Sequence, residues 1–117
     1  MSGTRILLVN LPRLLSGVVR GLVAQNDDLR IVGEVSASAL DDALASTRAD
    51  IVAMGVEAEQ EAMSTAVVRR RHPLLRVLML DVGGQYATMD EPDGRRRQVP
   101  ELSPAVLLEL LRGPMLQ

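Results

Sequence analysis

The chain has 117 residues, the size of one domain with a single hydrophobic core. Apolar residues make up 47% of the chain and charged residues 24%, which are ordinary shares for a globular protein. The formal net charge of −2 gives no overall attraction to nucleic acid or to an anionic membrane.

Several residue types are scarce or missing. The chain has one Tyr and no Phe, Trp, Cys or Lys, so all 13 basic residues are Arg. With only one Tyr, the chain lacks the stacking platforms that single-stranded nucleic acid needs. The lack of Cys excludes disulfides, thiolate metal sites and Cys nucleophiles. No signal peptide is visible and no apolar run approaches the roughly 20 residues of a membrane span, so we expect a cytoplasmic protein.

The first half of the chain alternates strand and helix patterns. Continuous apolar runs at 5–10 and 50–54 are typical of central parallel strands that are covered on both faces. A third, weaker strand is predicted at 29–35. Apolar pairs from Leu14 to Val23 predict an amphipathic helix that begins at Arg13. A second helix is predicted to begin after Ser38, which would be its N-cap, and a third is predicted over 57–71.

The second half is regular at its two ends and irregular in between. Residues 76–81 predict another buried strand, and Ser103-Pro104 predicts the start of a last helix. Between them, residues 86–89 are expected to form one or two helical turns, and residues 91–94 a turn. Residues 95–100 are too polar for a central strand, so we interpret them as an edge strand.

These elements predict an α/β fold in one domain, residues 1–117. The sheet is expected to be doubly wound, with five parallel strands in the order 2-1-3-4-5, helices on both faces and a degenerate fourth helix region.

Six segments together resemble a known family. The sequence is similar to the receiver (CheY-like) domain of bacterial two-component response regulators, in the subgroup usually joined to a helix-turn-helix. The resemblance is carried by Arg5–Val9, Leu14-Leu15, Leu29–Val35, Ala49–Met54, His72–Leu80 and Leu102–Pro104, in that order. It implies the receiver fold and a role in signal transduction.

The resemblance also shows what this sequence lacks. Receivers use two acidic residues for Mg²⁺, an acceptor Asp, a Thr or Ser, and a Lys, because phosphoryl transfer needs a hard cation and charge neutralisation. Those positions correspond here to Asn10 and Leu11, Gly55, Asp81 and Pro100. We therefore predict a pseudo-receiver that is not phosphorylated by the family mechanism, with no metal, no cofactor and no enzymatic activity.

The preferred hypothesis is a phosphorylation-independent module that binds another protein or a second copy of itself. The region 82–112 is expected to mediate this contact, because the sequence departs most from the family between residues 82 and 100. Candidate surface residues are Tyr86, Met89, Arg95, Arg96 and Arg97. Nucleic acid, membrane and an output domain are not expected.

Some alternatives remain open. The chain could instead be a sensor that binds an anionic metabolite or nucleotide near Asn10, Gly55, Asp81 and Gly83, at the carboxyl ends of the strands. Arg95–Arg97 could simply protect a sheet edge. Asp81 could cap a nearby backbone amide. Arg69–Arg71 are interpreted as cations at a helix C-terminus.

Overall fold

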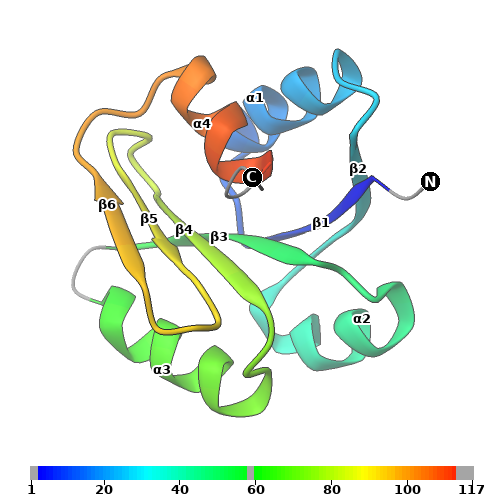
Figure 1. The fold of residues 1–117 in the computed structure, drawn as a ribbon, viewed down its shortest axis with the longest axis vertical. Coiled ribbons are helices and arrows are strands. Elements are labelled where there is room, and N and C mark those ends of the chain that lie inside the picture. The colour runs from blue at the N-terminus through cyan, green and yellow to red at the C-terminus, as the bar shows by residue number, and fades with distance from the viewer. Residues whose placement is uncertain (1–2, 58–59, 113–117) are drawn as a thin grey trace.

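The computed structural model describes residues 3–57 and 60–112, without the side chains of residues 61–64. Its centre is a six-stranded sheet with helices on both faces (Figure 1). The strands are β1 (Thr4–Val9), β2 (Leu29–Val35), β3 (Ile51–Val56), β4 (Arg76–Asp81), β5 (Ala87–Asp90) and β6 (Arg96–Val99). The helices are α1 (Arg13–Ala24), α2 (Leu40–Thr47), α3 (Glu61–Arg71) and α4 (Pro104–Arg112), with a 3-10 turn, η1 (Ala37–Ala39), before α2.

The sheet order β2-β1-β3-β4-β5-β6 confirms the predicted doubly wound arrangement and adds one strand to it. Strands β2, β1, β3 and β4 pair in parallel, as the continuous apolar runs predicted. Helices α1 and α4 lie on one face of the sheet, and α2 and α3 lie on the other (Figure 1). Every residue of β3 is buried, since both faces of this central strand are covered.

The core is divided into two layers by the sheet. Alternate strand residues such as Ile6, Leu8 and Leu78 pack with α1 and α4 in one layer. The residues between them, such as Leu7 and Val77, pack with α2 and α3 in the other. Because strand side chains alternate between faces, two residues that are adjacent in sequence serve two different layers.

The expectation of five parallel strands is wrong at the end of the sheet. Residues 86–89 were expected to be helical, but β5 covers residues 87–90 and pairs antiparallel with β4. Strand β6 then pairs antiparallel with β5, so β6 runs in the direction of β4 but does not touch it. Two turns cause the reversals, and each contains a glycine with positive φ: Gly84 at 77° and Gly94 at 93°.

The edge-strand interpretation of residues 95–100 is confirmed, since β6 is the last strand of the sheet and three of its four residues are exposed. The turn over residues 91–94 is also confirmed: the Gly94 N–H donates to the Glu91 carbonyl at 3.0 Å. It connects β5 to β6, so the segment in place of a fourth receiver helix is a β-hairpin, residues 87–99. Buried β4 thus gains a strand partner on the side that would otherwise expose its backbone.

Helix ends follow the sequence signals in part. The Ser103 hydroxyl accepts a hydrogen bond from the Val106 N–H at 3.2 Å, which confirms the predicted cap of α4. Ser38 is not the cap of α2, because it lies inside η1 and its hydroxyl contacts that of Ser36. Helix α3 begins at Glu61 rather than at residue 57.

The apolar pairs of α1 do not all face the sheet. Leu15 and Val19 are buried, whereas Leu14 is 80% exposed and Val18 is 38% exposed. The helix turns by about 100° per residue, so Leu14 and Val18 lie outside the buried stripe. None of the helices in the described ranges combines the length and apolar character that a bilayer span requires.

Candidate functional site

The position that corresponds to the phosphoryl acceptor is closed by backbone. Gly55 is buried within β3 and pairs with Leu80 of β4. A Cβ atom built on Gly55 would lie 2.5 Å from the carbonyl oxygen of Asn10 and 3.3 Å from Cδ of Pro12. Real Cβ atoms essentially never come within 3.0 Å of such a neighbour. The turn after β1 therefore occupies the space that any side chain at position 55 needs.

The two positions that correspond to the Mg²⁺-binding acids have structural contacts instead. Asn10 has a left-handed backbone with φ of 55°, and this conformation directs its carbonyl towards Gly55. The Asn10 N–H donates to the Val35 carbonyl at 3.0 Å, and its Oδ1 accepts from the Ala37 N–H at 3.2 Å. Leu11 is half-buried against the core layer of α1 and α4. This turn thus joins the ends of β1 and β2.

Asp81 and Pro100 stand at the remaining two receiver positions. The Asp81 side chain accepts a hydrogen bond from the Gln85 N–H at 3.4 Å, and the Asp81 carbonyl accepts one from Gly84 at 2.7 Å. The prediction that Asp81 caps a nearby amide is confirmed. Pro100 is exposed and directly follows β6. In the described part of the chain, no three His, Asp or Glu side chains form a group that could hold a metal ion.

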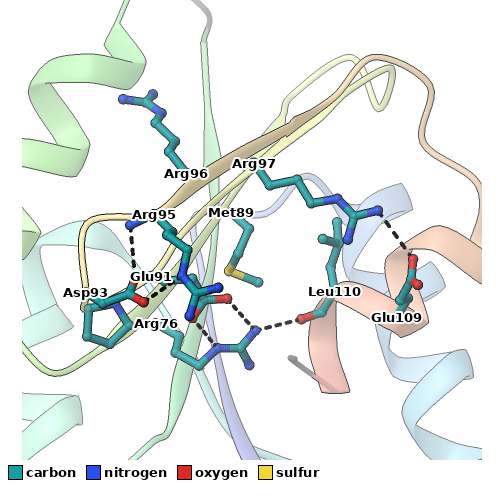
Figure 2. A pocket seen from close by; sticks show the side chains of 10 residues that line it. Arg76, Met89, Glu91, Asp93, Arg95, Arg96, Arg97, Glu109 and Leu110 are labelled. Carbon is teal, nitrogen blue, oxygen red and sulfur yellow. Dashed lines mark hydrogen bonds and ion pairs between the residues drawn. The ribbon is translucent and has the colours of Figure 1, made fainter. Parts of the chain in front are cut away.

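The five predicted surface residues do not form one patch. Tyr86 is half-buried and precedes β5, at the edge of the sheet where Asp81 lies. Met89 is 2% exposed, so it belongs to the core layer of α1 and α4. Arg97 pairs with Met89 across the hairpin and lies over the same face. Arg96 points away from Met89 (Figure 2).

A groove of about 610 Å³ lies between the hairpin and the C-terminal half of α4. Figure 2 shows Met89 and Leu110 at its centre, with arginine side chains around them. The lining residues are Arg76, Met89, Glu91, Pro92, Asp93, Arg95, Arg96, Arg97, Glu109 and Leu110. This volume is within the roughly 300–1,000 Å³ typical of binding pockets. The groove is at the amino end of β4, opposite the edge where receivers carry their phosphorylation site.

One wall of the groove is fixed by Arg76, which begins β4. Its guanidinium donates to both carboxylate oxygens of Glu91, at 2.9 and 3.1 Å, and to the Leu110 carbonyl at 3.3 Å. Both side chains of this ion pair are largely buried. A forked pair of this kind holds its geometry better than a single contact does. Arg76 therefore links β4, the hairpin turn and the end of α4.

Two further arginines of the groove, Arg95 and Arg97, are held more loosely than Arg76. Arg95 pairs with Asp93 at 2.7 Å within the exposed hairpin turn. The Arg95 N–H, followed by its guanidinium, lowers the pKa of the Asp93 carboxyl, and Asp93 raises the pKa of Arg95. Arg97 reaches across the groove to Glu109 of α4 at 3.5 Å, and these two side chains are 60% and 62% exposed (Figure 2). Exposed ion pairs contribute about 0–1 kcal/mol, so Glu109 is an easily replaced partner.

Arg69 has a specific role that the sequence interpretation missed. Its guanidinium donates to the Asp90 carboxylate at 2.8 and 3.1 Å and to the Asp90 carbonyl at 3.1 Å. It also donates to the carbonyls of His72, Pro73 and Leu75. Arg69 thus fastens the hairpin to the end of α3. Only the pairing of β5 with β4 brings Asp90 to this place, so no local sequence signal could have revealed it.

A second cavity, of about 420 Å³, lies between α2 and the connection from α3 to β4. Beside it, Asp41 of α2 bonds to Arg71 and to Nε2 of His72, the latter at 2.8 Å. The hydrogen bond from His72, followed by that from Arg71, lowers the pKa of the Asp41 carboxyl. These contacts join α2 to α3, so Arg71, like Arg69, is ion-paired as well as placed at a helix terminus.

Comparison with known proteins shows which solved structure the fold is similar to. No protein-family model matches the sequence, and no characterised protein matches it either. Among solved structures, the chain is similar to the RcsB response regulator of Salmonella typhimurium, a structure reported for its conformational dynamism in DNA interaction. The TM-score is 0.60 at 18% sequence identity, over 73% of this chain and 45% of that chain.

The fold is therefore receiver-like, as the sequence resemblance predicted. At 18% identity the likeness concerns the fold alone, and the chain matches less than half the length of that response regulator.

Proposed function

We propose that the chain is a signalling module with a receiver-like fold that acts without phosphorylation, by binding another protein or a second copy of itself. The observation that supports this most is the closed acceptor position. The Asn10 carbonyl lies where a side chain of residue 55 would begin. A receiver that uses phosphorylation needs a carboxylate there, with space for Mg²⁺ and a phosphoryl group in front of it.

The hairpin over residues 87–99 supports the choice of interaction surface. It replaces the expected fourth helix and builds a groove with α4 that contains arginines and a methionine. Arginine is enriched at the centres of protein interfaces. Arg95 and Arg97 are both exposed and lie on the rim of this groove. They are the two residues of the predicted surface that we assign to the contact.

The alternative function, a ligand sensor that binds at the carboxyl ends of the strands, has less support. Asn10 and Pro12 pack against Gly55, and Asp81 is used in the turn that precedes β5. Both cavities described above lie at the amino ends of the strands instead. The interaction module is therefore the function that we propose.

We expect the double variant Arg95→Glu/Arg97→Glu to lose self-association or a specific partner, because charge reversal places like charges against the bound surface. Sedimentation of the purified protein measures self-association. Immobilised protein, followed by mass spectrometry of what it retains from a native extract, measures partner binding. The matched control is Arg30→Glu, an exposed charge reversal on β2 at the other edge of the sheet.

A partner that the native chain and Arg30→Glu retain, but the double variant does not, supports the proposal. Retention should be the same with and without Mg²⁺ and a small phosphodonor. Equal behaviour of all three proteins in both assays would show that this surface is not the interface.

A further inference from the structure

We infer that the exposed side of α1 is a self-association surface, on which the α1 helix of a second copy of this chain packs in antiparallel orientation. The stripe that makes this surface consists of Leu14, Gly17, Val18 and Gly21. Self-association is thereby assigned to α1, which goes beyond the proposed function, and the hairpin over residues 87–99 is left free for another protein.

The stripe carries apolar surface that nothing in the described chain covers. Its four residues recur at the spacing i, i+3, i+4 and i+7, which places them on one side of a helix. Leu14 is 80% exposed and Val18 is 38% exposed, whereas Leu15 and Val19 cover the sheet. Full burial of one such side chain contributes about 1.5–3 kcal/mol, so a partner that covers Leu14 gains most of the available energy there.

The two glycines make the stripe complementary to itself. Nothing lies within 4 Å of a Cβ atom built on Gly17 or on Gly21. In an antiparallel pair centred between residues 17 and 18, Leu14 of each copy faces Gly21 of the other, and each Val18 faces a Gly17. Every large side chain then lies over a residue without one, and the two helix axes can approach closely.

The charges at the two ends of α1 are the reverse of those that its macrodipole favours. A helix carries partial positive charge at its N-terminus and partial negative charge at its C-terminus. Helix α1 begins with Arg13, has no acidic residue in its first turn and no basic residue in its last, and is followed by Asp27 and Asp28. Asp28 is paired with Arg112 at 2.8 Å. Among the described residues, neither Arg13 nor Asp27 has a partner, and both are exposed.

A second copy in antiparallel orientation corrects both ends of the helix. It places its Arg13 beside the C-terminus and Asp27 of the first α1, and two-fold symmetry makes this contact reciprocal. A parallel pair would instead bring each Arg13 beside the other. Arg20 lies on the same flank as Arg13, but it is already paired with Glu34 at 2.6 Å. The charges therefore select both a second copy as the occupant and its direction.

The size of the stripe predicts a weak and reversible dimer. Helix α1 has 12 residues, which corresponds to a length of about 18 Å. Standard protein interfaces bury about 800 Å² on each partner, which is more than one short helix offers. We therefore expect a dissociation constant of roughly 0.1 mM.

Sedimentation equilibrium over a range of concentrations up to several times that value measures the dimer. Leu14→Glu should weaken dimerisation at least roughly tenfold, because it removes the buried leucine and places like charges near the two-fold axis. The matched control is Leu74→Glu, the same change at a leucine that is 85% exposed between α3 and β4. It should leave dimerisation unchanged. Circular dichroism of each variant confirms that the fold is retained.

An exchange of charges tests the antiparallel orientation. Arg13→Glu and Asp27→Arg should each weaken dimerisation a few-fold, because each leaves like charges facing one another across the pair. The double variant Arg13→Glu/Asp27→Arg should recover the native affinity, since opposite charges meet again with their signs exchanged. Within one chain these two residues are separated by the length of α1, so the recovery must come from a contact between two copies.

Three results would overturn the inference: a native chain that stays monomeric over the whole range, equal weakening by Leu74→Glu and Leu14→Glu, or no recovery in the charge-exchanged double variant. If the native chain is monomeric while Arg95→Glu/Arg97→Glu still loses a protein partner, the α1 surface is wrong and the proposed function stands. If dimerisation responds to Leu14→Glu but the hairpin variant loses nothing, the α1 surface stands and the proposed hairpin surface fails.

Discussion

Arg69→Ala should lower the free energy of unfolding by about 3 kcal/mol, a large share of the roughly 5–15 kcal/mol of a typical domain. The Arg69 side chain is 24% exposed and that of Asp90 is 13% exposed. Removal of the guanidinium leaves the Asp90 carboxylate nearly buried and uncompensated. It also removes the donor from four backbone carbonyls, and an unsatisfied buried polar group costs about 1–3 kcal/mol. Chemical denaturation followed by circular dichroism measures the effect.

The neighbouring arginine provides a matched control. Arg70 is exposed at the end of α3, so Arg70→Ala should change stability by no more than about 0.5 kcal/mol. Arg69→Lys should recover only part of the loss, because an ammonium group cannot reproduce the planar fork that reaches five acceptors. Equal, small effects of Arg69→Ala and Arg70→Ala would show that the hairpin is held by β4 alone.

Gly55→Ala should also be strongly destabilising, with an expected loss of about 2–3 kcal/mol in the free energy of unfolding. The added methyl group would lie 2.5 Å from the Asn10 carbonyl oxygen. That atom belongs to the backbone, so it cannot move aside as a flexible side chain would. The turn after β1 must shift, and the Asn10 hydrogen bonds to Val35 and Ala37 shift with it. The denaturation midpoint measures the loss.

Gly17→Ala makes the same chemical change with the opposite expected sign. Nothing lies within 4 Å of a Cβ atom built on Gly17, which is exposed on α1. Alanine should stabilise that helix by up to about 1 kcal/mol, because glycine is a poor helix former. If Gly55→Ala is as stable as the native chain, then position 55 has room for a side chain and the argument for a closed acceptor position fails.

The parallel half of the sheet could be predicted from sequence because each of its strands has a signal within itself. Runs such as residues 6–9 and 77–80 are apolar throughout, and this pattern distinguishes a strand covered on both faces from an edge strand. The missing receiver groups were equally visible, because Asn10, Gly55 and Asp81 occupy positions fixed by the strand ends. What Gly55 contacts was not visible, since that depends on the backbone of Asn10.

The hairpin could not be predicted, because local signals in Ala87–Asp90 are weak and tertiary pairing decides its structure. The backbone of β4 would otherwise be exposed, and two glycine-containing turns let the chain reverse beside it. Ala87–Asp90 therefore pair with β4 as a strand. The candidate groove depends on that choice. Met89 becomes part of the core, while Arg95 and Arg97 become separated from Arg96. The run of three arginines signalled an unusual edge but carried no information about which side each one faces.

The central claim, a receiver-like scaffold that acts without phosphorylation, is tested most directly by intact-mass spectrometry. The native protein is incubated with Mg²⁺ and a small phosphodonor and sampled over time, beside a receiver domain that retains its acceptor aspartate as a positive control. The account predicts that the control gains the mass of one phosphoryl group while this chain keeps its unmodified mass. A phosphoryl group on this chain that hydroxylamine removes, as it does an aspartyl phosphate, would contradict the account.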